Sequence, residues 1–351
     1  MSVLTEAQMR QLLNERSVDL TPLSIRAIAS RKHRRTQGDV LFELEWADNW
    51  RGDFIAEITT ASTPRALEAA TVTAQRYAGD ERYPLVIAPY LSPEALDRCL
   101  DREVSAIDLS GNAVIIVPGE LAVYRTGFPN KYPASRAIKS IYQGKSSLVP
   151  RVFLLQPLFE YVQDIKKEIE RKGVSISLGT VSKVLKGLAD DLVVQKEPQI
   201  ALIQPSRLLD RLAEGYHEDR IRVGESVEVK LQLDSEQLWR LRRAAERNGL
   251  EIVGGTLGDD DPVPESGPFP IYVERLEPIL AELDLPTVRR FATVTLIQSN
   301  DPRIYFDRRD REGFYWASPI QRYLELAVGG KREREMSTEL RSRILAGLPD
   351  G

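Results

Sequence analysis

The sequence contains few of the side chains that most often build metal sites and nucleophilic sites. Its 351 residues include one cysteine, Cys99, and two histidines, His33 and His217. A single cysteine excludes a disulfide within the chain and a zinc site built from several cysteines. Two histidines also supply little material for histidine-based metal or triad chemistry. Several classes of enzyme are therefore disfavoured.

Long apolar runs are missing as well. No stretch approaches the roughly 20 apolar residues that a membrane-spanning helix requires, and the first residues lack the basic and then apolar layout of a signal peptide. Hydrophobic residues make up 42% of the chain, which is ordinary for a globular protein. The length predicts two or three domains. We therefore expect a soluble, cytoplasmic protein with no membrane partner.

Positive charge is slightly outnumbered overall, with 48 lysines and arginines against 52 acids, but it predominates in one stretch. The whole chain carries a net charge of −4, whereas residues 131–188 contain eleven lysines and arginines against four acids, a net charge of +7. Concentrated positive charge is what neutralising DNA phosphates requires. A charge run on a helix is also commonly a solvated face, and both interpretations are open for Lys166, Lys167, Arg171 and Lys172.

The segment Ser177–Leu188 carries the most informative pattern. Four apolar residues recur at helical spacing, and polar and basic side chains occupy the opposite face. Ser177 is a good N-cap, because its hydroxyl can accept a hydrogen bond from an amide of the first turn. The apolar residues are Leu178, Val181, Leu185 and Leu188, and the opposite face presents Thr180, Lys183 and Lys186. This pattern suits a helix in the major groove, although an ordinary surface helix has the same amphipathicity.

The flanking segments favour the groove-binding interpretation. Helices are predicted over residues 148–155 and 159–172, the second ending at Gly173 in a left-handed C-cap, and a hairpin over residues 192–203. Three helices followed by a hairpin is the order of a winged helix-turn-helix, which we predict over residues 131–216. Its phosphate contacts would be Lys139, Lys145 and Arg151, and its groove-facing residues Ser177, Thr180, Lys183 and Lys186. The hairpin tip pairs Lys196 with Glu197 and predicts no minor-groove role.

Residues 38–130 predict an α/β domain in which strands and helices alternate. Strands are expected over 39–46, 53–59, 83–88, 104–108 and 113–117, and helices over 63–77 and 92–100. Asp39 on the first strand and Glu57 on the next resemble the carboxylate layout of the PD-(D/E)xK restriction-endonuclease-like fold. In active members of that fold the two acids hold Mg²⁺, which polarises the phosphate and activates water.

One position departs from that layout. The lysine two residues after the second acid is replaced by Thr59, whose hydroxyl cannot supply a positive charge. Gln75, with Tyr77, resembles the glutamine and tyrosine of RecB-like nucleases at a different spacing. We therefore predict a degenerate nuclease-like domain without confident catalytic or metal-binding residues, and without a cofactor. The alternative is a Mg²⁺-dependent nuclease that uses Asp39, Glu57 and Gln75.

The two ends of the chain are less informative. Residues 1–37 contain one predicted helix, Glu6–Glu15, and a basic cluster over residues 31–35 that suits phosphate contact and a solvated linker equally. Residues 217–351 predict a further α/β domain, with strands over 226–233, 272–274, 291–297 and 303–306 and helices over 235–248, 318–327 and 336–346. Its Gly254–Pro268 segment combines glycines with aspartates, but its prolines predict a solvated loop. Arg308–Arg311 predicts a solvated turn.

Four segments together resemble a known bacterial family: Pro84–Pro93, Ile107–Asn112, Ser177–Leu188 and Ala317–Leu326. They resemble AbiEi-family antitoxins of type IV toxin–antitoxin systems, in the version with a nuclease-like domain. The resemblance implies transcriptional repression, opposition to a nucleotidyltransferase toxin, and a nucleotidyltransferase-like α+β fold for residues 217–351. The simplest members begin with the winged helix, whereas here it is central, and this departure puts the antitoxin role in more doubt than DNA binding.

We therefore predict an α/β multi-domain, sequence-specific transcriptional regulator of the repressor or antitoxin type, which binds double-stranded DNA and whose nuclease-like domain is catalytically degenerate. Two alternatives are the Mg²⁺-dependent nuclease and an interaction protein that neutralises a cognate toxin. Winged-helix repressors often act as dimers, and the sequence leaves a homodimer open because no segment predicts a dimer seam.

Overall fold

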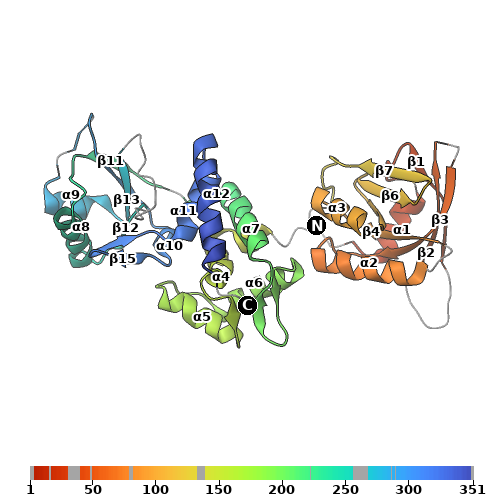
Figure 1. Cartoon of the computed structure of the whole chain (residues 1–351), viewed down its shortest axis with the longest axis horizontal. Coiled ribbons are helices and arrows are strands. Elements are labelled where there is room, and N and C mark those ends of the chain that lie inside the picture. The colour runs from red at the N-terminus through yellow and green to blue at the C-terminus, as the bar shows by residue number, and fades with distance from the viewer. Residues whose placement is uncertain are drawn as a thin grey trace. The chain divides into compact units, whose positions relative to one another are not determined.

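The chain folds into two compact units of mixed α/β structure with several sheets (Figure 1). The N-terminal unit comprises residues 1–138 with 190–192, and the C-terminal unit comprises residues 139–189 with 193–351. The computed structural model describes residues 4–15, 17–30, 40–47, 50–78, 82–132, 139–221, 223–255, 268–285, 287–288 and 290–348. Within these ranges no helix is both long enough and apolar enough to cross a membrane.

The N-terminal unit is built on a seven-stranded sheet whose strands follow one another in chain order. The first three strands are antiparallel, the next two run parallel to the third, and the last two return antiparallel. The elements are α1 (Glu6–Asn14), β1 (Leu23–Ser30), β2 (Val40–Trp46), β3 (Trp50–Ile58), α2 (Pro64–Ala78), β4 (Tyr83–Ala88), α3 (Pro93–Asp101), β5 (Ser105–Asp108), β6 (Ala113–Val117) and β7 (Leu121–Arg125).

Both faces of this sheet are covered. Successive side chains of a strand point to opposite sides of the sheet, and each set packs into a separate core. Leu85 and Ile87 of β4 join a core that includes Met9 and Leu13 of α1. The alternate residues of β4 join a second core with α2 and α3. The five strands and two helices predicted within residues 38–130 are therefore confirmed. The predictions omitted β1 and β7, and α1 and β1 belong to this unit instead of forming a separate N-terminal segment.

The C-terminal unit begins with three helices and a small antiparallel sheet. The elements are η2 (Lys139–Tyr142), η3 (Gly144–Ser147), α4 (Leu148–Phe153), β8 (Leu158–Phe159), α5 (Val162–Arg171), α6 (Leu178–Asp190), β9 (Val194–Gln195) and β10 (Ile200–Leu202). The strand order is β8-β10-β9. The predicted hairpin and the C-cap at Gly173, where φ is +88°, are confirmed. Residues 158–159, predicted near the start of a helix, form the third strand instead.

The remainder of the unit is a six-stranded sheet with helices, joined to the first part by α7. The elements are α7 (Pro205–Glu218), β11 (Ser226–Val229), α8 (Ser235–Arg247), β12 (Ile252–Gly254), β13 (Phe269–Val273), α9 (Leu276–Leu283), β14 (Val294–Gln298), α10 (Pro302–Tyr305), β15 (Arg309–Arg311), β16 (Phe314–Trp316), α11 (Pro319–Ala327) and α12 (Lys331–Ala346). The strand order is β11-β14-β13-β12-β16-β15.

Two predictions for this part were wrong. Residues 303–306, predicted as a strand, lie in and just after helix α10, and residues 309–311, predicted within a turn, form strand β15. Asp301 caps α10 by accepting a hydrogen bond from the Arg303 amide, and Pro302 occupies its first turn, which explains the helix. Most of the predicted loop at Gly254–Pro268 lies outside the described residues.

Close backbone contacts join the first part of the C-terminal unit to α6 and α7. A β-carbon on Gly187 of α6 would lie 2.9 Å from Cδ1 of the buried Ile141 in η2. A β-carbon on Gly215 of α7 would lie 2.6 Å from the Tyr142 carbonyl oxygen. Glycine at these two positions permits an approach that a side chain would block. The predicted boundary at residue 216 therefore falls inside one compact unit.

Candidate nucleic-acid interface

Helix α6 presents one side to the core and the other to solvent. Ser177 caps the helix, since its Oγ accepts a hydrogen bond from the Thr180 amide at 3.1 Å. The Ser177 and Thr180 hydroxyls are also hydrogen-bonded to each other, at 2.8 Å. The residues buried on the core side are Val181, Val184, Leu185, Leu188 and Ala189. Leu178, predicted in the apolar stripe, is 44% exposed instead, because it lies in the first turn, beyond the reach of this core.

The solvent side of α6 carries the predicted groove-facing residues. Ser177, Lys183 and Lys186 are exposed, and Thr180 is half-buried. Neither lysine forms an ion pair with any described residue. Their two positive charges therefore point into solvent without an acidic partner. We call Ser177, Thr180, Lys183 and Lys186 the α6 face.

The basic residues of α5 differ from those of α6, because acids neutralise them. Three of the ion pairs lie within α5 and the fourth reaches the C-terminal sheet region. The pairs are Lys166 with Glu170 at 2.7 Å, Lys167 with Asp164 at 3.2 Å, Arg171 with Glu168 at 2.6 Å, and the terminal Lys172 with Asp307. The open question about this charge run is thus answered in favour of a solvated helix face whose cations are paired, whereas Lys183 and Lys186 of α6 are not paired with any described residue.

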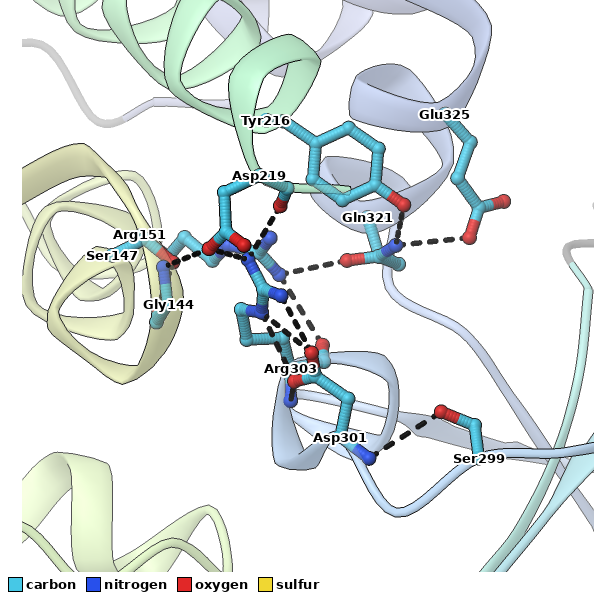
Figure 2. A network of polar contacts seen from close by, with 10 residues as sticks. All are labelled: Gly144, Ser147, Arg151, Tyr216, Asp219, Ser299, Asp301, Arg303, Gln321 and Glu325. Atoms are coloured by element: carbon cyan, nitrogen blue, oxygen red, sulfur yellow. Dashed lines mark hydrogen bonds and ion pairs between the residues drawn. The ribbon is translucent and has the colours of Figure 1, made fainter. Parts of the chain in front are cut away.

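Arg151, predicted to contact a phosphate, cannot do so. Its side chain on α4 is almost fully buried, with 1% of the residue exposed. Its Nη1 donates to the Gln321 Oε1 at 2.8 Å and to the Arg303 carbonyl oxygen at 3.2 Å (Figure 2). Burial, together with the nearby positive charge of Arg303, lowers the pKa of Arg151 to about 10, which still leaves the guanidinium charged at neutral pH. Arg151 is an internal structural group.

The other two predicted phosphate contacts lie away from α6 in the chain. Lys145 is exposed on η3 and has no ion pair with the described residues. It lines a cavity together with Asp219 and Arg303. Lys139 begins η2, and its side chain lies outside the described part of the chain. At the hairpin tip, Lys196 and Glu197 are both exposed, so the tip carries little net charge.

A polar network surrounds Arg151 and joins α4, α7, α10 and α11 (Figure 2). Arg303 is its centre: Nη2 donates to the Asp301 carboxylate at 2.6 Å, and Nη1 donates to the Asp219 carboxylate at 3.1 Å. The same Asp219 carboxylate accepts a hydrogen bond from the Gly144 amide at 2.8 Å. Burial opposes ionisation of Asp301, but the hydrogen bonds from Arg303 outweigh it and hold the pKa of that carboxyl below its usual value.

Only part of this network has a local signal in the sequence. The Asp301-Pro302-Arg303 triplet is a typical helix start and would have corrected the predicted strand. The contact between Arg151 and Gln321, in contrast, joins residues that are far apart in the chain and has no local pattern.

The predicted nuclease residues are only partly placed. Glu57 is half-buried on β3, and the Thr59 hydroxyl donates to the Ala61 carbonyl oxygen at 3.1 Å, so no positive side chain stands at the lysine position. The Gln75 amide donates to the Arg102 carbonyl oxygen at 3.1 Å, at the end of α3. Gln75 is about 16 Å along α2 from the helix end that follows β3, given the 1.5 Å rise per residue. The structure does not bring Gln75 to Glu57.

Metal-binding geometry is not evident in the described part of the chain. Asp39, the first predicted acid, lies outside the described residues, as does the basic cluster over residues 31–35. Among the described residues, no group of three or more histidines, cysteines and acids is arranged to hold a metal ion.

The Ile107–Asn112 segment of the family resemblance is a structural turn. Asp108 is fully buried, and its carboxylate accepts five hydrogen bonds of 2.7–2.9 Å. The donors are the amides of Leu91, Ser110, Gly111 and Asn112 and the side-chain amide of Asn112. Burial raises the pKa of the Asp108 carboxyl, and these donors act against that rise. The motif fixes the connection between β5 and β6.

Comparisons of the chain with protein-family models, with curated proteins and with solved structures found no match.

Proposed function

We propose that this chain is a sequence-specific, double-stranded DNA-binding transcriptional regulator of the repressor or antitoxin type. One observation carries the proposal: α6 buries its apolar side and presents two unpaired lysines, with a serine and a threonine, on the opposite side. Unpaired lysines neutralise phosphates, and short polar side chains reach base edges. The paired cations of α5 offer much less to DNA.

The order of the elements supports a winged helix-turn-helix. The elements follow one another in the order α4, β8, α5 and α6, and the β9–β10 hairpin comes next. The three strands pair in the order β8-β10-β9. In such a domain the third helix is the one that enters the major groove. The α6 face occupies that position. The nucleotidyltransferase-like fold of residues 217–351 and a cognate toxin partner stay predictions from the sequence resemblance.

The first test replaces one lysine of the α6 face. In Lys183→Ala, binding to a duplex that the wild-type protein selects from a random-sequence library is expected to weaken several-fold. The slope of log affinity against log salt should fall by about 0.9, the loss of one phosphate contact. Fluorescence anisotropy at several salt concentrations measures both quantities.

The matched control is Lys167→Ala. It removes the same charge from the neighbouring helix, but this lysine is 68% exposed and already paired with Asp164. The salt slope of this variant should equal that of the wild-type protein. If both variants change the slope equally, or if neither does, α6 is not the DNA-contacting helix.

A Mg²⁺-dependent nuclease is the alternative function, and the order of elements in the N-terminal unit supports a nuclease-like fold but not the activity. A helix, three antiparallel strands, a second helix and a parallel fourth strand are typical of the restriction-endonuclease-like fold. We propose that this unit is catalytically inactive, since Thr59 stands where the lysine is needed.

Accordingly, wild-type protein and Glu57→Ala should both leave supercoiled plasmid intact after incubation with Mg²⁺ or Mn²⁺, as judged on agarose gels. A commercial restriction enzyme in the same buffer shows that the assay detects cleavage. Nicking by the wild-type protein that disappears in Glu57→Ala would establish the nuclease instead.

A further inference from the structure

A cavity in the C-terminal unit lies where the helical part meets the C-terminal sheet. Its volume is about 760 Å³, within the roughly 300–1,000 Å³ typical of small-molecule sites. On one side it is bounded by η3 and the end of α7, and on the other by the segment between β14 and α10. The lining residues are Gly144, Lys145, Asp219, Val223, Gly224, Gln298, Ser299, Asn300, Asp301, Pro302 and Arg303.

The acids of this cavity are already neutralised. The carboxylates of Asp219 and Asp301 both accept hydrogen bonds from Arg303. Behind Arg303 lies the buried guanidinium of Arg151, and Lys145 is exposed at the cavity without an ion pair among the described residues. The charged lining residues are two cations, Lys145 and Arg303, and two anions, Asp219 and Asp301; Arg303 pairs with both anions, and Lys145 has no ion pair with the described residues. A cation would meet no free carboxylate there, whereas an anion would meet Lys145.

Two side-chain amides can add hydrogen bonds beside the lysine. Gln298 accepts a hydrogen bond from the Leu276 amide with its Oε1, which leaves its Nε2 as a donor. Asn300 is exposed and makes no side-chain hydrogen bond with the described residues. Apolar surface is present too, because Val223 is 56% exposed and Pro302 lines the same cavity.

We propose that this cavity binds a small organic anion, with its carboxylate or phosphate group at Lys145 and Asn300 and its apolar part against Val223 and Pro302. Charge-assisted hydrogen bonds to an anion are stronger than neutral ones, which makes the lysine the principal determinant. This binding does not require DNA. If the proposed function holds, the ligand is an effector, because η3 leads directly into α4 of the DNA-binding part.

The test is isothermal titration calorimetry of the full chain with two probes, citrate for carboxylates and inorganic phosphate for phosphates, at constant ionic strength. Wild-type protein should bind at least one probe saturably at one site. Lys145→Gln and Asn300→Ala should each weaken that binding, the first by about tenfold or more, the worth of one charge-assisted contact. Lys196→Gln, which removes an exposed lysine from the tip of the β9–β10 hairpin, should bind like the wild-type protein.

The outcomes separate this site from general charge effects and from the DNA-binding proposal. The proposal is overturned if neither probe binds saturably, if Lys145→Gln or Asn300→Ala binds unchanged, or if Lys196→Gln weakens binding as much as Lys145→Gln. Because the titrations contain no DNA, a failure here leaves the Lys183→Ala result untouched, and the reverse holds as well.

Discussion

Replacing Asp108 by alanine should destabilise the N-terminal unit by about 4 kcal/mol or more, since each buried donor left without an acceptor costs about 1–3 kcal/mol. Five donors lose their partner in this variant. The loss is local to the turn between β5 and β6 and to the segment at Leu91, whose amide donates a hydrogen bond to this carboxylate.

Asp108→Asn is the matched control. Its amide group faces donors where a carboxylate oxygen stood, which is unfavourable. Because asparagine keeps the size of the side chain and one acceptor oxygen, its effect should nevertheless be clearly smaller than that of alanine. Hydrogen–deuterium exchange of the full chain, read by mass spectrometry with peptides of each unit, measures both. Unchanged protection across residues 82–117 in Asp108→Ala would show that the carboxylate does not hold this turn.

Replacing Arg151 by alanine should cost the C-terminal unit about 3–5 kcal/mol, because it removes a large buried side chain and leaves a cavity beside unpaired polar groups. The Gln321 Oε1 and the Arg303 carbonyl oxygen both lose a donor. The Nε of Arg151 has no acceptor among the described residues, and Arg303 repels its charge. The guanidinium itself is therefore a costly group to bury.

Arg151→Met distinguishes the loss of volume from the loss of charge. Replacing a buried charged group by an apolar side chain of similar size is often neutral or stabilising, so methionine should cost much less than alanine. Urea unfolding of the full chain, followed by far-ultraviolet circular dichroism, gives both values. Equal losses in the two variants would mean that the charge, not the packing, holds α4 against α11.

Much of the fold could be predicted because its signals are local. The strands within residues 38–130 and helix α6 follow apolar periodicity, and the cap at Ser177 follows from residue type. Strand β1 alternates less clearly and leads into a basic cluster, while β7 is a half-exposed edge strand, so both were missed. Helix α10 has only four residues, too few for a periodic pattern.

The same distinction between features with a local sequence signal and features without one applies to the candidate site. The exposed lysines of α6 follow from its helical period, and the pairing of Lys166 with Glu170 follows from their spacing of four residues. The burial of Arg151 does not follow from any local pattern. It depends on Gln321 and Arg303, which lie more than a hundred residues away in the chain. A basic residue in an apolar helix has the same sequence signature whether it meets a phosphate or a buried glutamine.

The contact between Gly187 and Ile141 bears on how such a protein can diverge. Helix α6 packs closely against η2 at Gly187, where a side chain would collide with Ile141. The packing therefore depends on glycine at this position. The outward residues of the helix take no part in that contact. Under the proposed function, substitutions of these outward residues would change the DNA sequence that the helix contacts without changing the packing of α6 on η2.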